Sequence, residues 1–209
     1  MTVQRLTILR LFGLRRGNNM AYYYVKSGGT ATGDGGRYTT AKTGSWATAF
    51  TATSEYYDNL EDAIENATTA PASGDDIRCS DLHSGSYAGA QYINKGDGVN
   101  IISVDDANCD QYKPGASEHN TQTSTYDDYY FFTGLVAGIS LKAEDNTVMG
   151  RPGDAGGTLY FQDLELESGA SIGDSCYFSD AGGIDATRTI FRNVDMRLGS
   201  TNAVAIIGD

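Results

Sequence analysis

The stretch FRNVDMRLG (191–199) repeats the pattern of FQDLELESG (161–169), and Phe191 follows Phe161 by 30 residues. In both stretches Phe is followed by a polar residue, by Asp or Asn, by an aliphatic residue, by an acid and by a second large apolar residue. Short strands that recur at intervals of about 20 to 45 residues are typical of a solenoid, in which one coil stacks on the next. The alternative is two ordinary hairpin strands with a chance similarity.

The repeat also predicts which side chains face the interior. Asp163 and Asn193 should lie at a turn, where a carboxylate or an amide can bond the backbone. Aromatic and aliphatic residues at equivalent positions should point inward and stack: Phe161, Leu164 and Leu166 on Phe191, Val194 and Met196.

The composition favours an all-β fold. The chain has 209 residues, of which 40% are hydrophobic, and this is enough to form a core. It contains 26 Gly and 14 Tyr but only 3 Pro, a balance typical of short strands joined by frequent turns. Further strands are expected at the segments 22–29, 76–80, 99–104, 138–143, 147–150, 176–178 and 203–208.

Charge is unevenly distributed along the chain. The net charge is −12, yet the amino-terminal arm at 1–19 contains Arg but no acidic residue. The acidic remainder should repel phosphate backbones, so nucleic acid is not expected as a partner. Arg10 interrupts the apolar run of the arm, which is also too short to span a membrane, so no membrane insertion is expected. One hypothesis is that translation begins at Met20, directly before the strand-like YYYV.

One amphipathic helix is predicted, at 58–67. Asp58 would cap its amino end, with Glu61 three residues later. In a solenoid, such a helix can cover the open end of the first coil and protect its unpaired edge. The apolar face of the helix would consist of Leu60, Ile64 and Ala67.

Four short motifs follow one another along the chain: YYV (23–25), WATAF (46–50), LEDAI (60–64) and GDDI (74–77). Their order resembles the amino-terminal entrance of right-handed parallel β-helix proteins of the pectate-lyase-like superfamily. The resemblance implies an all-β fold, a right-handed parallel β-helix with a short amphipathic capping helix at its amino-terminal end. It implies one domain at 20–209, with the cap and first coil at 20–80 and further coils at 81–209, including a long loop at 105–134.

Cysteine and histidine form no recognisable metal or disulfide pattern. Cys79, Cys109 and Cys176 are widely spaced, and His83 and His119 are the two histidines. Neither a disulfide framework nor a structural zinc site is therefore expected. The cysteines should be small side chains that are buried or half-buried.

No cofactor is expected, and calcium is the one exception considered. Asp105, Asp106 and Asp110 crowd one loop, and calcium prefers such oxygen ligands. However, neither the EF-hand spacing nor the glycine-rich nonapeptide of calcium-binding β-rolls is present. Solvated loop carboxylates are the alternative interpretation.

The polar segment 105–134 ends in an aromatic cluster. Tyrosine offers a sugar ring a flat apolar face and a hydroxyl, so the candidate carbohydrate-binding residues are Tyr126, Tyr129 and Tyr130. The alternative is that these tyrosines pack the loop onto the rest of the fold.

No catalytic residue can be chosen from the sequence. A polysaccharide lyase would need a basic residue, and a glycoside hydrolase would need a pair of carboxylates. Arg192 and Arg197 have opposite parity on their predicted strand and should project to different faces. We expect such arginines to face solvent and to balance Glu165 and Glu167 on the adjacent coil.

Two classes of function follow. The first is a non-enzymatic structural component of a bacteriophage virion, such as a tail spike, a fibre or a capsid-surface protein, that contacts carbohydrate. Its expected partners are further copies of the chain in a homotrimer, other virion proteins and a cell-surface polysaccharide. The alternative is the amino-terminal part of a secreted or cell-surface polysaccharide lyase or glycoside hydrolase, or a bacterial surface adhesin.

Overall fold

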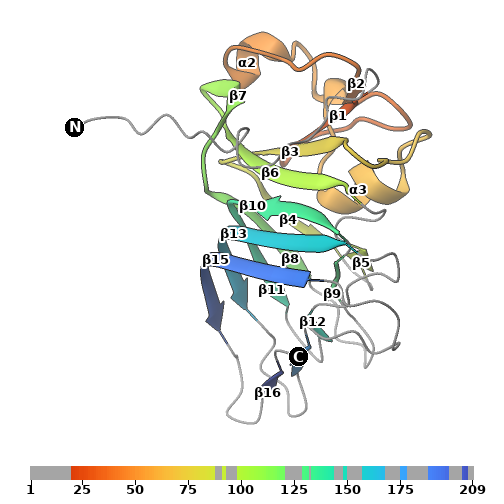
Figure 1. The fold of residues 1–209 in the computed structure, drawn as a ribbon. Coiled ribbons are helices and arrows are strands. Elements are labelled where there is room, and N and C mark those ends of the chain that lie inside the picture. The colour runs from red at the N-terminus through yellow and green to blue at the C-terminus, as the bar shows by residue number, and fades with distance from the viewer. Residues whose placement is uncertain are drawn as a thin grey trace.

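The computed structural model describes residues 20–87, 91–92, 98–120, 129–131, 133–143, 148–149, 157–167, 175–177, 188–197 and 204–206. These residues form mostly β-strand with a few short helices, so the predicted all-β class is confirmed. Figure 1 shows the strands stacked beside one another along the molecule, with the helices near the amino-terminal strands.

A run of parallel strands forms the first part of the larger sheet. β1 (Tyr22–Val25) pairs with β3 (Asp76–Ser80), and β3 pairs with β6 (Asn100–Asp105). The run continues through β10 (Gly134–Ala137), β13 (Thr158–Glu167) and β15 (Arg188–Arg197). Because these neighbours all point the same way, the chain returns between them by crossovers and not by hairpins. One short strand, β2 (Arg37–Tyr38), pairs antiparallel with β1.

A second parallel run uses the later halves of the two longest strands. β4 (Ser84–Tyr87) pairs with β8 (Ala116–Asn120), β8 pairs with β11 (Ile139–Ala143), and β11 pairs with the end of β13. A separate parallel sheet contains the third run: β5 (Gln91–Tyr92), β9 (Tyr129–Tyr130), β12 (Val148–Met149), β14 (Ser175–Tyr177) and β16 (Val204–Ile206).

The repeated stretches lie in register on neighbouring strands. Phe161 lies beside Phe191, with ring centroids 5.4 Å apart and ring planes that differ by 17°. Because β13 and β15 run parallel, the alternative of two ordinary hairpin strands is wrong. The other predicted partners are also in register, Leu164 with Val194 and Leu166 with Met196.

Stacked inward residues form the core. Ile77 lies beside Ile101, Ile101 beside Val136, and Val136 beside Phe161. All four are buried to an exposure of 1% or less. Burying one such side chain contributes about 1.5–3 kcal/mol, so this column is a main source of stability.

β13 and β15 each bend at one residue. Asp163 and Asn193 have φ values of 51° and 52°, in the left-handed region that Asn and Asp adopt more readily than other side chains. Gly138, with φ 73°, lies two residues before Ser140, which is in register with Glu165. It therefore holds the position equivalent to Asp163. The predicted turn is confirmed, and its side chains bond each other, since Asn193 Nδ2 donates to Asp163 Oδ1 at 2.9 Å.

The bend overturns the prediction that Arg192 and Arg197 project to different faces. Both arginines are exposed. Strict alternation fails because Asn193, between them, leaves the extended conformation and resets which face the following residues occupy. The predicted charge balance is found for Arg197, which forms an ion pair with Glu165 on the neighbouring strand.

The predicted helix at 58–67 is the shorter α3 (Leu60–Glu65). Its N-cap is Asn59, whose side chain accepts a hydrogen bond from the Asp62 amide at 2.8 Å. Asp58 does not cap the helix, because its carboxylate accepts the Gly28 amide instead. The apolar face of α3 packs into the core through Leu60, Ala63 and Ile64.

Two other short helices precede α3. The WATAF segment contains α2 (Trp46–Ala49), and a 3₁₀ turn follows at Thr53–Glu55. The indole of Trp46 is buried against Phe50, with ring centroids 4.7 Å apart, and against Tyr24 at 5.9 Å. This second cluster lies on the other side of β1 from the main core, because successive side chains of a strand alternate.

The segment 105–134, predicted as one long loop, contains strands. β7 (Asn108–Tyr112) folds back antiparallel onto β6, and β8 and β9 follow it. The sequence conceals these strands because their side chains are mostly polar. On β8 the inward positions carry Ala116 and Glu118 and not large apolar residues.

The prediction of buried cysteines is confirmed for the two whose side chains are described. Cys79 and Cys109 are fully buried and are not joined in a disulfide. Burial raises the pKa of the Cys109 thiol to about 11. The side chain of Cys176 lies outside the described residues.

Candidate functional site

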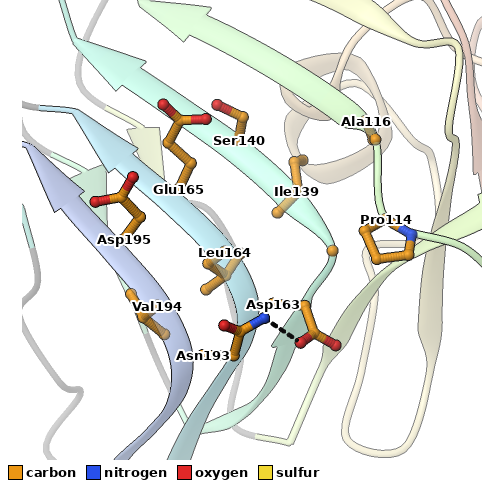
Figure 2. Close-up of a pocket in the computed structure, with 12 residues that line it drawn as sticks. Pro114, Ala116, Ile139, Ser140, Asp163, Leu164, Glu165, Asn193, Val194 and Asp195 are labelled. Atoms are coloured by element: carbon orange, nitrogen blue, oxygen red, sulfur yellow. Dashed lines mark hydrogen bonds between the residues drawn. The ribbon is translucent and has the colours of Figure 1, made fainter.

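An open groove of about 740 Å³ follows the bend of the parallel strands. Figure 2 shows Glu165 and Asp195 on neighbouring strands, with Asn193 bonded to Asp163 at the bend. The strand residues that line the groove come from the start of β8 and β11 and from the middle of β13 and β15. It is lined by Pro114, Gly115, Ala116, Gly138, Ile139, Ser140, Asp163, Leu164, Glu165, Asn193, Val194 and Asp195.

The Asp163 carboxylate of the groove accepts three hydrogen bonds from neighbouring side chains. Its Oδ2 atom accepts hydrogen bonds from the Tyr112 hydroxyl at 2.7 Å and from Gln162 Nε2 at 3.1 Å, and Asn193 bonds Oδ1. Burial works against the charge of Asp163, but these hydrogen bonds outweigh it and hold its pKa below the ordinary value. Burial, followed by the bond to Asp163, raises the pKa of Tyr112. At neutral pH the pair is therefore a carboxylate and a neutral phenol.

A second polar group lies farther along the same strands. Glu165 is in register with Asp195, and Arg197 Nη2 lies 2.9 Å from Asp195 Oδ2. Arg197 also pairs with Glu165, and these contacts raise the pKa of its guanidinium, with the hydrogen bond to Asp195 as the largest cause. Exposed ion pairs of this kind contribute little to stability because solvent screens them, so a ligand can compete for these carboxylates.

The chemistry of the groove is that of a polar binding surface. The carboxylate oxygens that line the groove accept hydrogen bonds, and the neighbouring Arg197 guanidinium, which pairs with Glu165 and Asp195, donates them. The Ser140 hydroxyl can do either. Neutral sugars carry hydroxyls that both donate and accept, so this arrangement suits a neutral saccharide better than an anionic one.

The predicted carbohydrate-binding tyrosines are not found in this groove. Tyr129 and Tyr130 form β9, which belongs to the separate sheet with β5 and β12. Tyr126 lies outside the described residues, as do the side-chain positions of Tyr129 and Tyr130. Their role in carbohydrate binding stays a prediction.

The predicted calcium ligands lie close in sequence at the β6–β7 hairpin but bond different partners. Asp105 accepts from Lys113 Nζ at 3.1 Å, and Asp106 pairs with Lys26. Asp110 accepts from Arg78 Nη1 at 2.8 Å. Within the described ranges, no group of three or more His, Cys, Asp or Glu residues is arranged to hold a metal ion. A calcium site at these residues stays a prediction.

Sequence reasoning did not identify the groove. One signal was available, because Glu165 and Asp195 are acids at the same place in the two repeats. Tyr112 gave no signal, since it reaches Asp163 only because β7 folds back onto β6.

Replacing Asn193 with Asp should destabilise the protein at neutral pH. The change removes the donor to Asp163 and places a second carboxylate beside it, in a conformation that Asp still tolerates, so we expect a loss of about 1–2 kcal/mol. The loss should shrink below about pH 4, where carboxyls of ordinary pKa become protonated. Urea unfolding at pH 7 and pH 3 measures both values.

The matched control is Asn193 replaced with Gly, which also removes the hydrogen bond but adds no charge. Apart from the effect of protonating Asp163 itself, the loss of stability in the Gly variant should be the same at the two pH values. An Asp variant that behaves like the Gly variant at both pH values would contradict the predicted repulsion.

Comparison of the chain with models of protein families, with curated proteins and with solved structures gives no match. In the part of the chain that the structure describes, no helix has the length and apolar character needed to cross a membrane.

Proposed function

We propose that the chain folds as a right-handed parallel β-helix and serves as a structural component of a bacteriophage virion, such as a tail spike or fibre. The observation that carries the proposal is the continuous parallel stacking from β1 to β15, with inward side chains in register. Crossovers between parallel strands are right-handed in nearly all proteins. A solenoid built in this way is stiff, because each coil is bonded to both neighbours along its length.

In this proposal α3 covers the first coil. Leu60 and Ile64 are buried against the same cluster as Tyr23 and Val25 of β1. An uncovered first coil would expose an apolar end and an unpaired strand edge, and both promote aggregation.

Replacing Ile64 with Asp should uncover that end. Ile64 is 3% exposed, and a charge buried there would expel the helix from the core. We expect aggregation and a lower melting temperature, measured by light scattering during heating. Ala70 replaced with Asp is the control, because it adds the same charge at an exposed position. Unchanged melting of the Ile64 variant would contradict the capping role.

The virion role predicts self-association. In this proposal further copies of the chain pack against the solenoid, so we expect a homotrimer that resists mild detergent. The solution mass by light scattering after size exclusion, with and without detergent, tests this. A monomer under both conditions would overturn the proposed assembly and favour a secreted polysaccharide-cleaving enzyme as the alternative.

We further propose that the groove at the bend contacts a cell-surface polysaccharide. Three carboxylates and no basic residue are among the residues that line the groove, on a chain of net charge −12, and this favours a neutral saccharide over a uronate polymer. Binding to immobilised neutral and acidic polysaccharides should differ, and Glu165→Gln with Asp195→Asn should weaken binding to the neutral one. Lys142→Gln, outside the groove, is the control. Equal binding of the neutral polysaccharide by the unchanged protein, the double variant and the Lys142 variant would contradict the assignment.

A further inference from the structure

A buried carboxylate occupies a position that neighbouring strands give to leucine. Glu118 on β8 is in register with Leu141 on β11, and Leu141 is in register with Leu166 on β13. Glu118 and Leu141 are both fully buried. Placing an ionisable group in an apolar column costs stability unless the group is hydrogen-bonded or paired. The contacts of Glu118 must therefore compensate for its burial.

Glu118 bonds a buried histidine. Its Oε2 atom lies 2.8 Å from His83 Nε2, and its Oε1 atom accepts the Leu60 amide at 2.6 Å. When Glu118 Oε2 accepts this hydrogen bond from a neutral imidazole, the imidazole proton is on Nε2 and the lone pair is on Nδ1. The site is closely built, because a Cβ on Gly85 would lie 2.0 Å from Glu118 Oε2 and 2.7 Å from His83 Cε1.

The free lone pair of His83 faces an exposed serine. His83 Nδ1 lies 3.3 Å from Ser27 Oγ, and His83 itself is only 1% exposed. Ser27 Oγ accepts the Ser84 amide at 2.8 Å and donates to the Ser84 carbonyl at 2.8 Å. Turning the hydroxyl hydrogen from that carbonyl to Nδ1 brings serine, histidine and carboxylate into one hydrogen-bonded relay. Catalytic bonds of this kind are often long before substrate binds.

We propose that Ser27, His83 and Glu118 form an ester-hydrolysing site. Ser27 is the nucleophile, His83 is the base, and Glu118 is a positioning residue that fixes the tautomer of His83. Because Ser27 is exposed, the substrate class is a carboxylic ester on the surface of a larger molecule. This activity goes beyond the structural role proposed above and does not depend on it.

The reaction balances as acyl transfer to water. Ser27 Oγ bonds to the ester carbonyl carbon while its proton passes to His83 Nδ1. The ester C–O bond then breaks, and the departing alcohol oxygen takes that proton. Water next attacks the acyl-serine and gives a proton to Nδ1, which returns it to Ser27 as the carboxylic acid leaves.

The first test uses a fluorophosphonate, which reacts with activated serines with loss of fluoride. We expect labelling at Ser27, located by mass spectrometry of the digested protein, and no labelling there in Ser27→Ala. Glu118→Gln keeps an oxygen for the Leu60 amide, but its NH₂ donates to Nε2 and moves the imidazole proton to Nδ1. Labelling of that variant should fall by about 100-fold or more. No label at Ser27 in the unchanged protein, or equal labelling of the Glu118→Gln variant, overturns the proposal.

A second test separates activation from a purely structural role for Glu118. Ser27→Cys should react with iodoacetamide at pH 6.5 about tenfold faster than Ser54→Cys, because a thiol beside a basic imidazole forms the thiolate more readily. Ser54 is exposed, and the unchanged protein provides the blank for the natural cysteines. The advantage should disappear when Glu118→Gln is added to Ser27→Cys. Equal rates for the two cysteines would contradict the assigned roles even if every variant folds.

Discussion

Replacing Phe161 with alanine should lower the free energy of unfolding by about 3–5 kcal/mol. Phe161 is 1% exposed and lies between two other rings. Its centroid is 4.9 Å from that of Phe131, with the planes at 87°, and 5.4 Å from that of Phe191, with the planes nearly parallel. The substitution leaves a cavity in the middle of the stack, and urea unfolding measures the loss.

The repeat itself provides the matched control. Phe191 is the same residue at the equivalent position, but it is only partly buried. Its replacement with alanine should therefore cost less, about half as much. Equal losses for the two variants would mean that burial within the stack does not determine the contribution of these rings.

Replacing Arg78 with methionine should lower the free energy of unfolding by a similar amount, about 3–5 kcal/mol at pH 7. The guanidinium donates to Asp110, lies 3.5 Å from Asp76 and stacks 4.6 Å from the centre of the Tyr22 ring. Methionine keeps the contact with the ring but leaves the buried Asp76 without its cation. Thermal or urea unfolding measures the change.

The pH dependence of this variant distinguishes the charge from the packing. Burial already raises the pKa of Asp76, and Arg78 opposes that rise. Without Arg78 the pKa should rise further. When the pKa of a carboxyl is higher in the folded state than in the unfolded state, the protein becomes less stable as pH increases through the range between the two pKa values. The loss should therefore be smaller near pH 4 than at pH 7, and adding Asp76→Asn should recover part of it. A loss that is the same at both pH values would contradict this explanation.

The features predicted most accurately from the sequence depend on apolar periodicity. The pairing of Phe161 with Phe191 follows from two stretches with the same order of residues, and the turn at Asp163 follows from a residue type that tolerates left-handed backbone. The helix face with Leu60 and Ile64 was predicted by its spacing. These signals are local, so they survive without knowledge of the fold.

Other features could not be predicted because they depend on contacts between distant segments. The strand β8 was missed because its inward residues include Glu118, which is tolerated only through its contacts with His83 and Leu60. The two histidines of the chain form no recognisable pattern in the sequence, so neither stands out as a base. Nothing in the order of residues shows that Ser27 and His83 meet across 56 positions.

The register of the core has a consequence for how fast the chain folds. Ile77 and Ile101 are 24 residues apart in sequence, whereas Ile101 and Val136 are 35 apart, and both pairs are neighbours in space. Closing the longer loop costs only about 0.3 kcal/mol more in chain entropy, because the cost grows with the logarithm of length. Folding rates, however, fall as contacting residues become more distant in sequence. The molecule should therefore fold slowly, in milliseconds to seconds or longer, and accept changes in the length of its connections with little loss of equilibrium stability.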